Sequence, residues 1–375
     1  MTQKNNEIIS YASPHTIKKF GLIERYVKGW APKLLNYGKC EGIVYIDCMS
    51  NSGYYYQDKD TKKDIIEGSA IRVARALSKV VCPSDKKIEV FFNDISEERK
   101  NYLEAKLQEL NLRRINFNCS CEDANIWLRK FSKFSIKKYA NYNILLVYDP
   151  YQASIDWDAL TPFFNVWGEI IINHMGSDSV RGLTQVKDPD KIKKYETTYQ
   201  KNINALISEH LSKDELEKLI IDIIKKKSVD CSGKTPYIAS FPFFNRTNGL
   251  LYNLVHVTKH IEGFELFKES AWSEFGGKSS IKHVRNPGQT VLDFFTGGVK
   301  NNPDSDCYEI RDIAQYIYSK YCEYGEYSIK QALDELKLHP VFPSYGYRPQ
   351  IKAALQGMGV EIKKGRMCFK NEENN

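Results

Sequence analysis

One stretch decides the fold, Ile43-Val44-Tyr45-Ile46-Asp47-Cys48-Met49-Ser50-Asn51-Ser52-Gly53. An apolar run that ends in an acid and continues into small residues predicts a buried parallel strand followed by a sharp turn. Small residues let the backbone bend there and approach a ligand closely. Ligands of open α/β sheets bind just outside the carboxyl ends of the strands. We therefore expect a nucleotide-like cofactor at this turn, the alternative being an ordinary strand-to-loop junction.

Further apolar runs follow, separated by segments with a helical pattern. The predicted strands cover residues 88–94, 115–119, 143–149 and 169–174. Strands that alternate with helices predict a doubly wound, Rossmann-like α/β sheet. Two later strands, at 236–244 and 250–257, are expected to form its antiparallel edge. Acids stand at or just past the ends of the first four strands, at Asp47, Asp94, Asp123 and Asp149.

Composition narrows the class of protein. The chain has 375 residues, of which 42% are hydrophobic and 27% charged, as expected for a soluble protein of two or three domains. We find no membrane-spanning run and no signal-peptide core, and the nine cysteines lack the spacing of a disulfide framework or a metal site. A cytoplasmic protein with reduced thiols and no bound metal is predicted. The net charge of +7 leans mildly toward a polyanionic partner.

The pattern of the chain predicts its division into domains. Residues 1–278 are expected to form the α/β domain, with a Lys-rich helical insertion at about 181–227. Residues 279–306 are predicted to form a linker. Residues 307–375 are predicted to form three helices and a hairpin, which is the layout of a winged helix. The basic residues of its third helix and wing would contact nucleic-acid phosphates: Arg348, Lys352, Lys363, Lys364 and Arg366. A protein-docking module is the alternative.

The acids at the strand ends resemble the class I S-adenosylmethionine-dependent methyltransferase fold. The chain has no G-x-G-x-x-G and no phosphate-cradling lysine loop, whereas S-adenosylmethionine has no phosphate and suits acids and small residues. Asp94 would accept hydrogen bonds from the ribose and Asp123 from the adenine amine, although either could instead cap a helix. The residues expected to hold the cofactor are Asp47, Ser50, Ser52, Gly53, Asp94 and Asp123.

A narrower resemblance rests on four short segments. Ser13–Phe20, Tyr45–Asp47, Gly68-Ser69 and Asp149–Tyr151 are similar to motifs of the three-Cys-motif partner proteins. The likeness covers roughly Tyr11 to Trp272. It implies a methyltransferase-like protein that acts with a radical-S-adenosylmethionine-type partner carrying three cysteines. The family usually has Asp-x-Phe-Ala-Gly-x-Gly at the main loop, and here Asn51 replaces one glycine. Asparagine tolerates positive φ best among the other residues, so we expect the turn to survive.

Asp149-Pro150-Tyr151 resembles the Asp-Pro-Pro-Tyr signature of enzymes that methylate exocyclic amines of bases. Asp149 and the Pro150 carbonyl would accept the amine protons, and Tyr151 would stack on an extruded base. A strand-ending turn is the alternative. The chain is thus predicted to be a methyltransferase acting on DNA or RNA with a partner protein. The competing hypothesis is an inactive protein of the same fold that binds nucleic acid or a partner. A metal-dependent nuclease is disfavoured because the acids end different strands.

Overall fold

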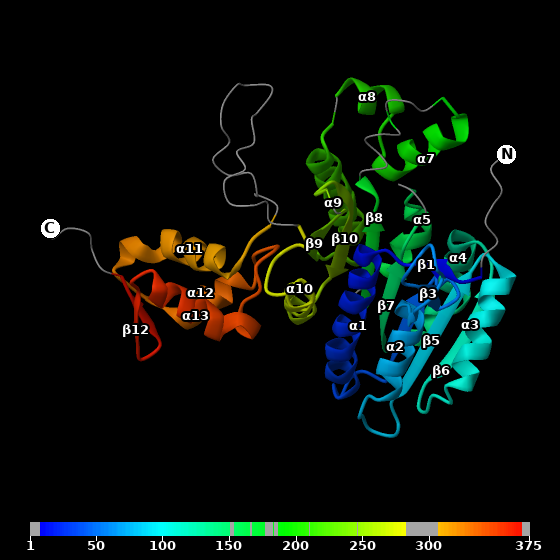
Figure 1. The fold of residues 1–375 in the computed structure, drawn as a ribbon, viewed down its shortest axis with the longest axis horizontal. Coiled ribbons are helices and arrows are strands. Elements are labelled where there is room, and N and C mark those ends of the chain that lie inside the picture. The colour runs from blue at the N-terminus through cyan, green and yellow to red at the C-terminus, as the bar shows by residue number, and fades with distance from the viewer. Residues whose placement is uncertain are drawn as a thin grey trace.

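The computed structural model describes residues 8–150, 154–165, 167–176, 183, 187–209, 211–245, 247–282 and 307–369. A seven-stranded sheet in the order β6-β5-β2-β7-β8-β10-β9 forms its centre (Figure 1). The first five strands of this order run parallel, and β10 is antiparallel to both of its neighbours. The predicted doubly wound sheet with an antiparallel edge is therefore confirmed. The strands are β2 (Gly42–Asp47), β5 (Lys87–Asp94), β6 (Asn116–Cys121), β7 (Tyr142–Tyr148), β8 (Gly168–His174), β9 (Tyr237–Phe244) and β10 (Leu250–Thr258).

Helices cover both faces of the sheet, which explains why β2, β7 and β8 are buried at every position. One face carries α1 (Pro14–Leu35), α2 (Ser69–Ser78), α3 (Glu97–Glu109) and α10 (Ile261–Glu274). The other carries α4 (Ala124–Phe134), α5 (Trp157–Leu160), α7 (Pro189–Tyr199) and α9 (Lys213–Ser232), and α8 (Ile203–Ser208) adds to this layer. A strand covered on both sides reads as a continuous apolar run, so the sequence pattern was informative here.

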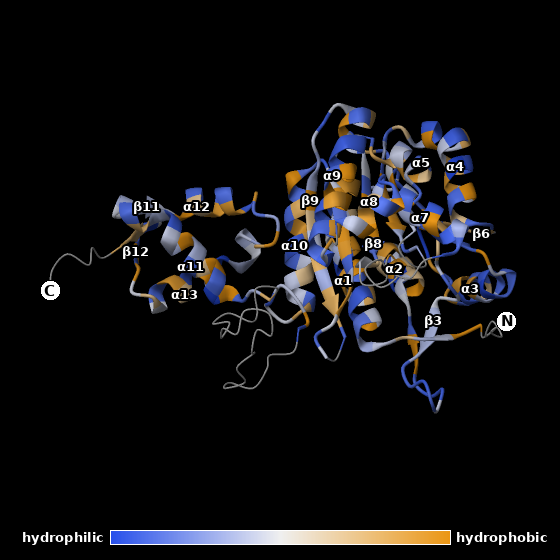
Figure 2. Cartoon of the chain, turned by 90° about the horizontal axis from the view of Figure 1, so that it is seen from above, coloured by the Kyte–Doolittle hydropathy of each residue, from blue (hydrophilic) through white to orange (hydrophobic). Residues whose placement is uncertain are grey.

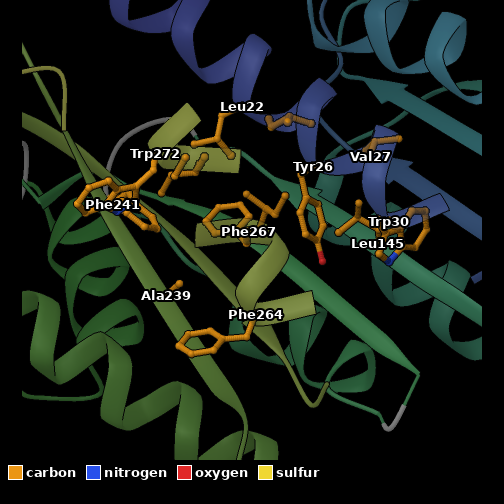
Figure 3. Close-up of a cluster of buried hydrophobic side chains, with 14 of the residues drawn as sticks. Leu22, Tyr26, Val27, Trp30, Leu145, Ala239, Phe241, Phe264, Phe267 and Trp272 are labelled. Atoms are coloured by element: carbon orange, nitrogen blue, oxygen red, sulfur yellow. The ribbon is translucent and has the colours of Figure 1, made fainter. Parts of the chain in front are cut away.

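The helix α1 begins at the Ser13-Pro14 pair, a sequence typical of a helix N-terminus. Ser13 is its N-cap and accepts a hydrogen bond from the Thr16 backbone N–H, while Pro14 takes the first helical position. Its apolar side packs between the sheet and α10, where Tyr26 meets Phe267 edge to face at 5.4 Å (Figure 3). Burying one such large apolar side chain is worth about 1.5–3 kcal/mol. This packing fixes the direction of α1 across the sheet.

A second, smaller sheet was not predicted. It joins β1 (Ser10–Tyr11), β3 (Tyr54–Tyr56) and β4 (Ile65–Glu67) in the order β1-β3-β4. The N-terminal segment thereby crosses the loop that follows β2. The Asn51 Nδ2 donates to the Ser10 Oγ at 3.4 Å, which ties the two segments together.

The insertion and the linker are described in part. Helices α7, α8 and α9 occupy the Lys-rich segment, and α9 continues to Ser232, beyond the expected end at 227. Arg181 and residues 283–306 lie outside the described residues. Within the part of the chain that the structure describes, no helix combines the length and the apolar character needed to cross a membrane.

The C-terminal residues form a separate cluster of helices and short strands beside α10 (Figures 1 and 2). Its elements are α11 (Ile310–Tyr321), β11 (Glu326–Ser328), α12 (Ile329–Leu336), α13 (Arg348–Gly357), β12 (Glu361–Lys363) and β13 (Arg366–Cys368). The strands pair antiparallel in the order β11-β13-β12. The Lys268 Nζ on α10 donates to the carbonyls of Lys337, His339 and Phe342 at 2.8–3.0 Å. This contact fastens the C-terminal module to the α/β domain.

Candidate functional site

A pocket of about 600 Å³ opens at the carboxyl edge of the parallel strands, where the sequence predicts a ligand. The loops after β2, β5, β6, β7 and β8 all contribute to it. The polar residues that line it are Asn51, Asp94, Arg99, Asp123, Asn125, Asp149, Ser154 and Asn173. The other lining residues are Cys48, Met49, Tyr55, Ile95, Ala124, Tyr148, Pro150 and Met175.

The loop after β2 turns through left-handed backbone. Asn51 has a φ of 57° and Gly53 a φ of 76°. The expectation that asparagine preserves this turn is confirmed. A Cβ on Gly53 would stand 2.6 Å from the Leu103 Cδ1, so both space and backbone conformation require glycine there.

Four of the six predicted cofactor residues shape this loop and do not line the pocket. Asp47 is buried and accepts hydrogen bonds from the Met49 backbone N–H at 3.3 Å and from the Ser69 Oγ at 3.2 Å. The Ser50 Oγ donates to the Asn93 carbonyl at 3.2 Å, and the Ser52 Oγ to the Tyr54 carbonyl at 3.1 Å. Both hydroxyl protons are thus used within the protein, and Gly53 serves the turn.

Burial raises the pKa of Asp47 to about 7, and the nearby charge of Asp149 adds to this shift. The hydrogen bonds from Met49 and Ser69 act in the opposite direction but do not cancel it. Asp47 is therefore a group whose charge changes near neutral pH beneath the pocket.

Asp94 and Asp123, the other two, do line the pocket. The Asp94 Oδ2 accepts from the Asn51 N–H at 2.9 Å, and its Oδ1 accepts from the Ser96 N–H at 2.8 Å. Asp123 caps α4 through its Oδ1, which accepts from the backbone N–H groups of Asn125 and Ile126. The capping alternative holds for Asp123, and its Oδ2 makes no hydrogen bond with any described residue. Ile95 also lines the pocket and is 72% exposed.

The predicted catalytic triplet begins at the end of β7. The Asp149 Oδ2 pairs with the Lys19 Nζ, and its Oδ1 accepts from the Asn173 Nδ2. Pro150 is buried in the pocket wall. Tyr151 lies outside the described residues. The structure thus brings Asp149 and Pro150 into the same pocket as Asp94 and Asp123.

Sequence reasoning missed Lys19, Ile95 and Asn173. Asn173 stands near the end of β8 as Asp149 follows β7, so the same strand-end rule would have found it. Its Oδ1 is buried and accepts no hydrogen bond from the described residues. Lys19 lies on α1, and no local pattern reveals that it reaches a residue 130 positions away.

The basic residues of the C-terminal module are not equivalent. Lys363 pairs with Glu361 at 2.7 Å, and Arg366 pairs with Glu326. Arg348 and Lys364 are exposed, Lys352 is half-buried, and these three form no ion pair with any described residue. Lys364 stands in the hairpin turn with a φ of 49°. That the five residues contact phosphates stays a prediction, and Lys363 and Arg366 each already have an acidic neighbour.

Among the described residues, no group of three or more His, Cys, Asp or Glu side chains could hold a metal ion. The acids that line the pocket come from different strands. Each is engaged by backbone N–H groups or by cationic and amide side chains.

Comparison with known proteins finds similarity in structure alone. No protein-family model matches the chain, and no curated protein matches it by sequence. Trm1 from Pyrococcus horikoshii, in complex with S-adenosyl-L-methionine, is 10% identical with a TM-score of 0.39 over 96% of this chain and 80% of that one. M. jannaschii TYW2, in complex with AdoMet, is 12% identical with a TM-score of 0.33 over 65% and 75%. An rRNA methylase from Streptococcus thermophilus is 11% identical with a TM-score of 0.29 over 63% and 93%.

The strand order itself identifies the class of fold. A seven-stranded sheet in which six strands run in one direction and one, beside the edge strand, runs against them is the arrangement of Rossmann-like methyltransferase folds. The narrower resemblance to three-Cys-motif partner proteins stays a prediction.

Proposed function

We propose that the chain is an S-adenosylmethionine-dependent methyltransferase that acts on an exocyclic amine of a nucleic-acid base. One observation carries the proposal. A single pocket at the carboxyl edge joins Asp94 and Asp123, suited to an adenosine, with Asp149 and Pro150, suited to an amine. The substrate end and the cofactor end are thus parts of the same cavity.

The residues present fit S-adenosylmethionine. The pocket lies within the usual size range for small-molecule sites, about 300–1,000 Å³. Each Asp94 oxygen accepts one backbone N–H and keeps a lone pair for a ribose hydroxyl. Ile95 offers apolar surface to the adenine, and the Asp123 Oδ2 can accept its amine. When bound, the cofactor supplies an electrophilic methyl group on a sulfonium.

The opposite end of the pocket favours an amine over a hydroxyl. A primary amine has two protons and is best held by two acceptors, whereas a hydroxyl has one proton. Asp149 keeps a lone pair on each oxygen, and the buried Asn173 Oδ1 beside it has no donor among the described residues. Lys19 and Asn173 orient the carboxylate. Held in this way, the amine nitrogen directs its lone pair at the methyl carbon and afterwards releases one proton to Asp149 or to solvent.

The C-terminal module is the part of the chain that supports nucleic acid as the substrate. Its order of three helices and three antiparallel strands supports a winged helix. Arg348, Lys352 and Lys364, which form no ion pair with any described residue, would contact backbone phosphates rather than bases. The partner protein with three cysteines is proposed from the resemblance in sequence alone.

A second candidate is an inactive subunit with the same fold. It is favoured by the finding that Asp47, Ser50 and Ser52 are used inside the loop and contribute no side chain to the pocket.

Calorimetry with S-adenosylmethionine and S-adenosylhomocysteine separates the two candidates. The enzyme is expected to bind both, and the Asp149→Asn variant should bind them equally well but lose methyl transfer to nucleic acid. If neither compound binds at millimolar concentration, the inactive subunit is the correct assignment.

A further inference from the structure

A second pocket, of about 580 Å³, lies at the opposite edge of the sheet. Asn143 and Glu169, each the second residue of its strand, stand in its wall, so it opens at the amino edge of β7 and β8. It lies between the last turns of α1 and the first turn of α10. No step of the proposed methyl transfer uses it.

The walls of this pocket are largely aromatic and aliphatic. Trp30 and Leu34 come from α1, Tyr37 follows the end of that helix, and Trp167, Tyr237, Ile261 and Leu266 complete the apolar lining. Trp30 is nearly fully buried (Figure 3). Its Nε1 donates to the Glu169 Oε1 at 3.0 Å. An apolar cavity with a few convergent polar groups is the usual form of a small-molecule site.

Hydrogen-bond acceptors lie among the buried residues of this second pocket. Glu169 is buried, and its Oε2 accepts from the Tyr26 hydroxyl and from the His256 Nε2. Burial alone would raise the pKa of Glu169, but the hydrogen bonds from His256, Tyr26 and Trp30 hold that pKa below its usual value. The carboxylate is therefore charged at neutral pH, and its Oε1 accepts a single hydrogen bond from the described residues.

Asn143 adds an acceptor that nothing in the described protein satisfies. Leu145 pairs with Glu169 across β7 and β8, so Asn143, two residues earlier, lies on the same face of the sheet. Asn143 is fully buried, and its Oδ1 has no hydrogen-bond partner among the residues that the structure describes. A buried polar atom left unpaired costs about 1–3 kcal/mol, so a ligand donor at this point would recover that cost.

Hydrogen-bond donors and cations also line this second pocket. The helix α10 has 14 residues, and its first-turn residues Ile261, Glu262 and Gly263 line the pocket. The side chain of His260, which precedes the helix, makes no capping hydrogen bond, so it satisfies none of the first-turn N–H groups. Lys259 also lines the pocket, and its Nζ donates to the carbonyls of Phe164 and Asn165. Lys33 of α1 adds a second cation to the lining.

We propose that this pocket binds a free α-amino acid with an apolar side chain. Its ammonium group would be held by Glu169 and by the Asn143 Oδ1. Its carboxylate would be held by the first turn of α10 and by Lys259, and its side chain would lie against Trp30 and Leu266. A purely cationic ligand would meet the two lysines, and a purely anionic one would meet Glu169, so charge complementarity favours a zwitterion.

Calorimetry on the full chain tests the assignment with leucine, methionine, phenylalanine and tryptophan as ligands. At least one is expected to bind. For the best ligand, the matching compounds without the carboxylate or without the ammonium (phenethylamine and phenylacetate in the case of phenylalanine) should each bind about tenfold or more weakly. If none of the four binds at millimolar concentration, or if a truncated compound binds as well as the amino acid, the proposal is wrong.

Variants connect the binding to the pocket. Asn143→Leu removes the unpaired acceptor and should weaken binding about tenfold or more while leaving the free protein equally or more stable. Lys259→Met should weaken binding as well. Tyr45→Phe is the matched control because it removes another buried polar atom without a partner, outside the pocket. Equal affinity in Asn143→Leu and the wild type would overturn the site, as would a loss of affinity in Tyr45→Phe. Binding of S-adenosylhomocysteine should be unchanged in all three variants, so this test does not depend on the proposed reaction.

Discussion

In the proposed complex, Asp94 is the residue on which cofactor binding depends most directly. Its carboxylate accepts both ribose hydroxyls in that complex, and a hydrogen bond to a charged group is worth about 1.5–3 kcal/mol. Since about 1.4 kcal/mol corresponds to tenfold in affinity, Asp94→Ala should weaken S-adenosylhomocysteine binding at least about tenfold. The loss of one of these hydrogen bonds alone would weaken the affinity about tenfold to about 150-fold.

The same substitution also frees the backbone N–H groups of Asn51 and Ser96, so a loss of affinity alone does not prove contact with the ribose. A cycle that pairs the protein change with a ligand change separates the two effects. The wild type should bind the 2′-deoxy analogue about tenfold or more weakly than S-adenosylhomocysteine, whereas Asp94→Ala should bind both compounds alike. Calorimetry supplies the four affinities, and circular dichroism checks that the variant is folded. If removal of the hydroxyl weakens binding by the same factor in both proteins, Asp94 does not contact the ribose.

The remaining predictions concern stability, pH and nucleic acid. Lys268→Met leaves Glu265 as an unpaired buried charge and should lower the free energy of unfolding by about 3–5 kcal/mol in a denaturant titration; an unchanged midpoint would contradict this. Asp47 has a folded pKa of about 7, above its unfolded value of 3.8, so the folded state binds the extra proton and stability should fall as pH rises from about 4 to about 7. Asp47→Asn should flatten that part of the stability profile, and an equally steep profile in the variant would refute the assignment. Lys364→Ala should lower the salt slope of duplex binding by about 0.9, and Lys363→Ala by less because Lys363 already pairs with Glu361; equal effects would show that the pairing is irrelevant.

The sheet could be predicted because its central strands are buried on both faces. Such strands appear as apolar runs, which are visible without any knowledge of their neighbours. The turn after β2 was predictable for a similar reason, since the need for left-handed backbone limits the residues that fit at Asn51 and Gly53. The sheet β1-β3-β4 was missed because its strands span two or three residues and carry no periodicity.

The site was predictable in its location but not in its contacts. Strand ends converge in any parallel sheet, which correctly brought Asp94, Asp123 and Asp149 together. Whether a particular oxygen faces the ligand depends on partners distant in sequence. The Ser50 Oγ is occupied by a carbonyl 43 residues away, and Asp149 by a lysine 130 residues away. Pairing of this kind is determined by tertiary packing, so no local pattern reveals it.

Asn51 stands where the predicted resemblance to three-Cys-motif partner proteins would place a glycine, and this difference bears on whether the protein is an enzyme. A glycine would adopt the same backbone without strain, but it could not make the side-chain contacts seen here. The Asn51 Oδ1 accepts from the Ser52 N–H at 2.6 Å, and its Nδ2 reaches Ser10 in the small sheet. Its backbone N–H, which a glycine would also provide, donates to Asp94, the proposed ribose acceptor. The asparagine therefore joins the N-terminal strand, the turn and the acid of β5 into one unit. Since the left-handed turn is kept and the Asp94 carboxylate is oriented by it, the departure from glycine is compatible with a working cofactor site and does not by itself favour an inactive protein.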